Sequence, residues 1–92
     1  MRILVTPTFE RAVKKLHQQQ KAALDEAVRA VASQPGVGET KVGDLAGVQV
    51  YKFRMGALLC LLAYRVLDEN TMKLLMVGPH ENFCRELKST EH

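Results

Sequence analysis

The sequence predicts an α+β fold in which an N-terminal helical hairpin packs on one antiparallel sheet, in the order β-α-α-β-β-β-α. Apolar residues recur at helical spacing between residues 8 and 33. Three runs rich in apolar residues then follow closely between residues 48 and 77, separated by a glycine or by Asp-Glu-Asn. With 92 residues, the chain is expected to form a single domain over 1–92.

The first strand and the helical hairpin come from the first third of the chain. Arg2–Thr6 is short and β-branched, which predicts a strand that ends at Pro7. Thr8 is the expected cap of the first helix, because its hydroxyl can accept a hydrogen bond from a free backbone N–H of the first turn. The polar stretch 17–20 is the expected turn between the helices. The second helix is expected to stop at Ser33, before a Gln-Pro-Gly sequence.

The rest of the predicted sheet follows a glycine-rich loop. Residues 36–47 are expected to form this loop, because four of these twelve residues are glycine. The second of the three following strands is nearly all apolar and is therefore the expected central strand, and 68–70 is the expected hairpin turn after it. The three strands and a closing helical segment are expected at Val48–Met55, Ala57–Leu67, Thr71–Val77 and Phe83–Lys88.

Composition excludes some classes of protein. A hydrophobic content of 47% is too high for an intrinsically disordered chain. Aromatic residues make up only 5%, and tryptophan is missing, which argues against stacking platforms for single-stranded nucleic acid. The net charge of +3 is compatible with an RNA, DNA or ribosome partner but does not establish one.

Cysteine usage and hydropathy predict a cytoplasmic protein. Cys60 and Cys84 are expected to be free thiols, because two cysteines make no disulfide framework and no signal peptide precedes them. No apolar run reaches the roughly 20 residues of a membrane span, so no membrane contact is expected. The cysteines and histidines show no paired ligand spacing, and no nucleotide-binding motif is present, so neither a metal nor a cofactor is expected.

Two cations are predicted to share one face of the first strand of the C-terminal sheet. Alternation places Tyr51, Phe53 and Met55 on the face toward the helices. Lys52 and Arg54 then lie on the other face, about 7 Å apart along the strand. This face is either a solvated surface or a phosphate-binding site.

A histidine follows the last strand by three residues. His80 can lie at the rim of the same sheet, and Arg85 follows five residues later, so both can converge with Lys52 and Arg54. Such a patch suits RNA cleavage by the RNA's own 2′-OH, because histidine can act as acid or base and the cations stabilise the phosphorane charge. Glu81 is a second candidate base. Alternatively, His80 and its two neighbours simply cap the last helix.

Several segments, taken in order, carry a resemblance to a known family. They are Lys41 followed by Leu45-Ala46-Gly47, the run Tyr51–Gly56, Tyr64 with Asp68-Glu69, and Gly78–Phe83. Over essentially its whole length the chain resembles toxins of the RelE/ParE superfamily from bacterial type II toxin–antitoxin modules. The resemblance implies a RelE-like fold and a cognate antitoxin that neutralises the toxin. It also implies that operator DNA is contacted only through the antitoxin.

The resemblance implies one of two targets. RelE-like toxins enter the ribosomal A site and cleave mRNA there, with cations on the strand matching 48–55 bound to the RNA backbone. ParE-like toxins act on DNA gyrase and lack the ribonuclease residues. We expect the ribosome and mRNA, with DNA gyrase as the alternative. A degenerate toxin that only binds its antitoxin and co-represses their promoter is a third reading.

Two positions depart from the RelE pattern. Leu61 stands where an arginine is common, which removes a phosphate ligand. Cys84 stands where an aromatic residue is common, which removes a stacking surface or a proton donor. The expected catalytic residues are His80, Arg54, Lys52 and Arg85, and the expected substrate contacts are Lys41, Lys52, Arg54, Glu81 and Cys84.

Overall fold

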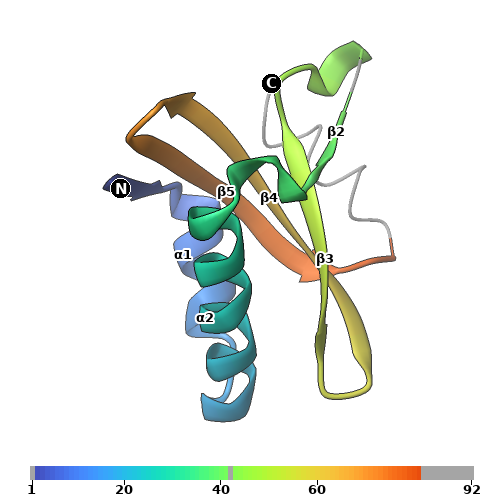
Figure 1. Cartoon of the computed structure of the whole chain (residues 1–92). Coiled ribbons are helices and arrows are strands. Elements are labelled where there is room, and N and C mark those ends of the chain that lie inside the picture. The colour runs from blue at the N-terminus through green and yellow to red at the C-terminus, as the bar shows by residue number, and fades with distance from the viewer. Residues whose placement is uncertain (1, 42, 82–92) are drawn as a thin grey trace.

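A computed structural model describes residues 2–41 and 43–81, which form two helices packed on a five-stranded mixed sheet (Figure 1). The strand order across the sheet is β1-β5-β4-β3-β2. The expected helix at Phe83–Lys88 lies outside the described residues. In chain order the elements are β1 (Arg2–Val5), α1 (Pro7–Lys14), α2 (Gln18–Ser33), the 3₁₀ turn η1 (Pro35–Val37), β2 (Glu39–Thr40), the 3₁₀ turn η2 (Gly43–Leu45), β3 (Gln49–Met55), β4 (Leu58–Asp68) and β5 (Thr71–Pro79).

The α+β class and the helical hairpin are confirmed, but the sheet is mixed rather than wholly antiparallel. The strands β3, β4 and β5 form the expected antiparallel meander. The first strand, β1, pairs in parallel with β5 at the edge of the sheet. This follows from the topology, because the hairpin carries the chain from β1 over the sheet to its far edge. The three-strand meander then leads back, so that β5 runs beside β1 in the same direction.

The helix boundaries differ from prediction at their starts. The cap of α1 is Thr6, whose hydroxyl oxygen accepts from the Phe9 N–H at 3.0 Å, so the prediction of Thr8 was wrong. Pro7 occupies the first turn, where its fixed φ and missing N–H do no harm. The second helix begins at Gln18, one turn earlier than predicted, and its end at Ser33 is confirmed.

Apolar residues form two clusters, one on each face of the sheet. The helix-side cluster joins the helices to the sheet, and the far-side cluster lies on the opposite face. Cys60 is a free thiol in the helix-side cluster, as expected, and burial raises its pKa, whereas Cys84 lies outside the described residues. The helix-side cluster is Phe9, Leu24, Ala27, Val31, Met55, Cys60, Leu62, Tyr64, Met72, Leu74 and Val77; the far-side cluster is Leu45, Val48, Val50, Leu61, Ala63, Leu75 and Met76.

The segment between β2 and β3 supplies part of the far-side cluster. Leu45 and Val48 are both buried there. Arg65 on β4 fastens the segment, because its guanidinium donates to the Ala46 carbonyl at 3.1 Å. Gly47 has a φ of +88°, and a Cβ at this position would lie 2.6 Å from the Arg65 Nη1 atom. Glycine is therefore required at this turn. None of the described helices is long and apolar enough to cross a membrane.

Candidate functional site

The far face of the sheet presents the two predicted cations. Lys52 and Arg54 on β3 are both exposed. Their neighbours Tyr51, Phe53 and Met55 pack against the helix-side cluster, which confirms the predicted alternation of faces. The ammonium and guanidinium groups therefore lie on the face that the helices leave uncovered.

The strand register aligns His80 with Arg54. Arg54 on β3 is opposite Leu59 on β4, and the His80 N–H donates to the Leu59 carbonyl at 3.0 Å. Two strand spacings separate the backbones of Arg54 and His80, which amounts to about 10 Å. The histidine is exposed just beyond the end of β5. The structure thus places the exposed His80 at the rim of the sheet, in the same cross-strand row as Arg54.

Arg54 also makes a local contact. Its Nη1 atom donates to the Ala57 carbonyl at 3.4 Å, across the turn between β3 and β4. Gly56 in that turn has a φ of +63°, a left-handed conformation that glycine adopts easily. The bond is long and exposed, so it orients the guanidinium only weakly. The remaining donors of Arg54 are available to an anion.

A carboxylate that the sequence interpretation missed lies on the same face. Glu39 in the two-residue strand β2 is opposite Val50, and Val50 is two residues before Lys52 on β3. Its carboxylate is paired with the Lys41 ammonium at 3.8 Å. A pocket of about 310 Å³ beside it is lined by Val37, Glu39, Val50, Tyr51 and Lys52. The sequence did not indicate Glu39 because β2 lies within the expected loop, where the alternation of strand faces was not used.

Leu61 occupies the centre of the far face. It is opposite Lys52 on one side and Gly78 on the other, and only 5% of its surface is exposed. It belongs to the far-side cluster together with Ala63. The cations therefore stand beside an apolar strip, and Leu61 contributes packing where a charged residue would contribute a phosphate ligand.

Tyr64 ties the segment before β2 to the centre of the sheet. Its side chain is fully buried, and its hydroxyl donates to the Pro35 carbonyl at 2.6 Å and accepts from the Gly38 N–H at 3.0 Å. Burial raises the pKa of this phenol, and the hydrogen bond from Gly38 opposes the shift. A Cβ on Gly38 would lie 2.5 Å from the Tyr64 oxygen. The bonds fix the backbone one residue before Glu39.

The structure says little about the positions of three of the predicted site residues. Glu81 is exposed immediately after His80, and Arg85 and Cys84 lie outside the described residues. Lys41 is partly buried, and the ion pair with Glu39 holds its ammonium near the pocket beside Lys52. In the described ranges, no group of three His, Cys, Asp or Glu side chains could hold a metal ion.

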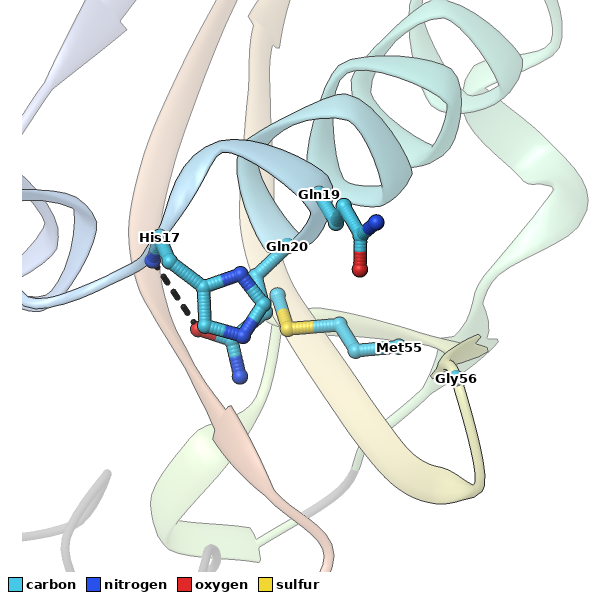
Figure 2. A pocket seen from close by; sticks show the side chains of 5 residues that line it. All are labelled: His17, Gln19, Gln20, Met55 and Gly56. Carbon is cyan, nitrogen blue, oxygen red and sulfur yellow. Dashed lines mark hydrogen bonds between the residues drawn. The ribbon is translucent and has the colours of Figure 1, made fainter.

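A second pocket lies where α2 begins. It has a volume of about 240 Å³ and is lined by His17, Gln19, Gln20, Met55 and Gly56 (Figure 2). The His17 N–H donates to the Gln20 side-chain oxygen at 3.1 Å, which caps the start of the helix. The lining contains no carboxylate and no cationic Lys or Arg, so it offers less for phosphate chemistry than the far face.

Comparison with known sequences gives a family match over most of the chain. The sequence model of one family matches residues 3–88, and this family is described as "ParE-like toxin of type II bacterial toxin-antitoxin system". A search of curated proteins found no significant match.

Comparison with solved structures supports the fold. The intact E. coli RelBE toxin–antitoxin complex matches with a TM-score of 0.70 at 20% identity, covering 87% of this chain and 96% of that chain. A doubly substituted E. coli RelE toxin in the free state matches with a TM-score of 0.74 at 19% identity, covering 98% and 92%. The archaeal RelE–RelB complex from Pyrococcus horikoshii matches with a TM-score of 0.54 at 15% identity, covering 87% and 94%. At these identities the likeness is one of fold.

Proposed function

We propose that this chain, which belongs to the ParE-like toxins of type II bacterial toxin–antitoxin systems, is a metal-independent endoribonuclease that cleaves mRNA on the ribosome. The observation that carries the proposal is the alignment of His80 with Arg54 across the far face, next to the exposed Lys52. An acid–base group in the same cross-strand row as a cation, with a second cation nearby, is the combination that cleavage of a phosphodiester by its own 2′-OH needs.

The site supplies a role for each step of this reaction. Glu81 is exposed immediately after His80, and we assign it the removal of the 2′-OH proton. The 2′ oxygen then attacks phosphorus and the bond to the 5′ oxygen breaks, leaving a 2′,3′-cyclic phosphate. His80 as imidazolium gives its proton to the departing 5′ oxygen, which leaves as a hydroxyl.

The cations of the far face are assigned the stabilisation of the transition state of the same step. The phosphorane carries extra negative charge on its non-bridging oxygens, and cations fixed before the reaction stabilise it without reorganisation. Lys52 and Arg54 are in place along one strand, and Arg85 is assigned the same role from its sequence position. Lys41, Glu39 and Cys84 are assigned contacts to the RNA away from the scissile bond.

A cognate antitoxin is the second part of the proposal. Two of the structurally similar proteins are RelE toxins in complex with RelB. We infer that a neighbouring gene encodes an antitoxin that neutralises this chain and that operator DNA is contacted only through it. An acidic antitoxin segment over Lys52 and Arg54 would block the ribonuclease face directly.

One observation favours DNA gyrase as the alternative target. Leu61 buries an apolar side chain at the centre of the face, where a phosphate ligand would otherwise stand. A face with an apolar centre can bind a protein surface as well as RNA. In that case the toxin would have no chemistry of its own, and His80 would have no catalytic role.

Induction in cells without the antitoxin tests the proposal. Wild type, His80→Ala, Arg54→Ala and the control Arg29→Ala on α2 are expressed, and mRNA 5′ ends are mapped. We expect codon-phased cuts with wild type and Arg29→Ala, and a loss of about 100-fold or more with the other two. Growth arrest with intact mRNA and DNA damage signalling would point to gyrase. Normal growth with all variants would leave a degenerate toxin that only co-represses with its antitoxin.

A further inference from the structure

The last strand, β5, contains one residue more than the stretch of β4 with which it pairs. Ala63 on β4 is opposite Met76. Tyr64, the next residue of β4, is opposite Leu74, so Leu75 is left without an opposite residue in the register. An extra residue of this kind is a β-bulge, which bends its strand and changes the direction of the side chains that follow. We name Leu75 and Met76 the β5 bulge.

Membership of the two apolar clusters shows the change of direction. Leu75 and Met76 are consecutive, yet both are buried in the far-side cluster. Leu74 before them and Val77 after them both belong to the helix-side cluster, although three positions separate these two residues. In a regular strand, residues an odd number of positions apart lie on opposite faces. The β5 bulge therefore reverses which positions of the strand face the helices.

This reversal decides the face on which His80 lies. The His80 N–H donates to the Leu59 carbonyl, so strand pairing continues as far as the histidine. Val77 faces the helices, and alternation then places His80, three positions later, on the far face. Counted from Leu74 in a strand without the bulge, His80 would be six positions away and would lie on the helix side. The sheet would then separate its imidazole from the cations of β3.

The side chains of this part of β5 do not by themselves require the bulge. Residues 74–77 are Leu-Leu-Met-Val, and all four are apolar, so either face of the sheet could bury each of them. Where the hydrophobic pattern does not specify the register, a strand can slip by one residue, which moves every side chain to the other face. A contact from outside the strand can then decide the arrangement.

Thr6 supplies such a contact. Its hydroxyl donates to the Leu75 carbonyl at 2.7 Å, and its N–H donates to the Leu74 carbonyl at 3.1 Å. The same hydroxyl accepts from the Phe9 N–H at 3.0 Å, and Phe9 is buried in the helix-side cluster. Thr6 is thus held at the start of α1, and from there it binds the carbonyl of the extra residue.

We propose that Thr6 is a positioning residue of the ribonuclease site: it holds the β5 bulge, and the bulge places His80 on the face of the cations. Five positions separate Leu75 from His80, which is about 17 Å along an extended strand. Thr6 therefore acts through the strand and not by contact with the scissile bond. This inference rests on the proposed ribonuclease function and names a residue on which the orientation of its general acid depends.

Substitutions of Thr6 separate the two bonds of its hydroxyl. Thr6→Ser keeps both. Thr6→Asp keeps an acceptor for the Phe9 N–H, since aspartate is a good helix cap, but an ionised carboxylate cannot donate to the Leu75 carbonyl. Thr6→Val keeps the shape of the side chain and removes both bonds, so it serves if the charged variant does not fold. Gln20→Ala is the control for a lost cap, because it removes the bond to the His17 N–H at the start of α2.

Cleavage of mRNA on purified ribosomes gives the first readout, with kcat and KM measured separately at a temperature where the variants are folded. We expect Thr6→Asp and Thr6→Val to lower kcat about tenfold or more, because the acid is misplaced. KM should change by less than about twofold, because the cations of β3 stay in place. Thr6→Ser and Gln20→Ala should keep kcat within about twofold. An unchanged kcat in folded Thr6→Asp or Thr6→Val would overturn the inference, as would an equal loss with Gln20→Ala.

NMR of the same proteins gives a readout that does not depend on activity. In wild type we expect nuclear Overhauser contacts between the His80 ring and the side chain of Leu59, which is opposite Arg54 on the far face. In Thr6→Asp these contacts should weaken, and the His80 amide should exchange about tenfold faster. A variant that keeps both wild-type properties would overturn the inference even if its kcat falls. If wild type does not cleave mRNA, the proposed function fails, and the NMR comparison still decides whether Thr6 sets the face of His80.

Discussion

The two faces of the sheet are made from the same strands but differ in the side chains that they present. The helix side is continuous apolar packing, from Tyr51 and Phe53 on β3 to Leu62 on β4. The far side alternates buried apolar residues such as Leu61 with the exposed cations Lys52 and Arg54. Strand alternation lets one segment contribute to both. Residues on the helix side should therefore determine stability, and the exposed residues on the far side should determine activity.

The largest expected effect comes from truncating the centre of the helix side. Leu62 is fully buried, so Leu62→Ala should lower the free energy of unfolding by about 2–5 kcal/mol, through lost burial and the cavity left behind. Urea denaturation of the purified toxin measures it. Leu67→Ala is the matched control, since half of that side chain is exposed, and it should stay within about 0.5 kcal/mol. Equal losses for the two variants would contradict the division between faces.

A smaller loss of stability is expected when the hydrogen bonds of Tyr64 to the segment before β2 are removed. Tyr64→Phe keeps the ring but leaves the Pro35 carbonyl and the Gly38 N–H without the phenol oxygen. The free energy of unfolding should fall by about 1–3 kcal/mol, because buried polar groups lose their partner. We also expect cleavage activity to fall, since the bonds hold the backbone next to Glu39.

Denaturation of Tyr64→Phe is compared with that of Tyr51→Phe, a half-buried tyrosine on β3. The control should change stability by less than about 0.5 kcal/mol. Faster amide exchange at Gly38 and Glu39, measured under conditions where both variants are folded, would show that the segment has been released. A Tyr64→Phe protein with normal stability and unchanged exchange would show that the bonds do not hold this segment.

The smallest effect on stability is expected on the far face itself. Lys52 is exposed, so Lys52→Ala should change the free energy of unfolding by less than about 0.5 kcal/mol. Binding of RNA should nevertheless weaken, and the dependence of log affinity on log salt should lose a slope of about 1 for the missing phosphate contact. Fluorescence titration of labelled RNA at several salt concentrations measures both. A large stability loss would mean that Lys52 is structural.

Some features of the fold were predictable because they depend on near neighbours in the chain. Helical spacing and strand alternation are local, so the hairpin, the β3–β4–β5 meander and the faces of Tyr51 and Lys52 were predicted correctly. The cap at Thr6 was missed because two threonines flank Pro7, and the sequence does not say which one the helix uses. The strand β2 was missed because two residues among glycines carry no period.

The sequence by itself determined the class of the fold, the alternation that separates Lys52 and Arg54 from the core, and the segments that resemble known toxins. Only the tertiary structure decided that β1 lies parallel to β5 at an edge of the described sheet, that Glu39 joins the cationic face, and that His80 shares a row with Arg54. The reason is that pairing register and strand order join residues far apart in the chain. No local pattern of hydrophobicity or turn residues encodes those contacts.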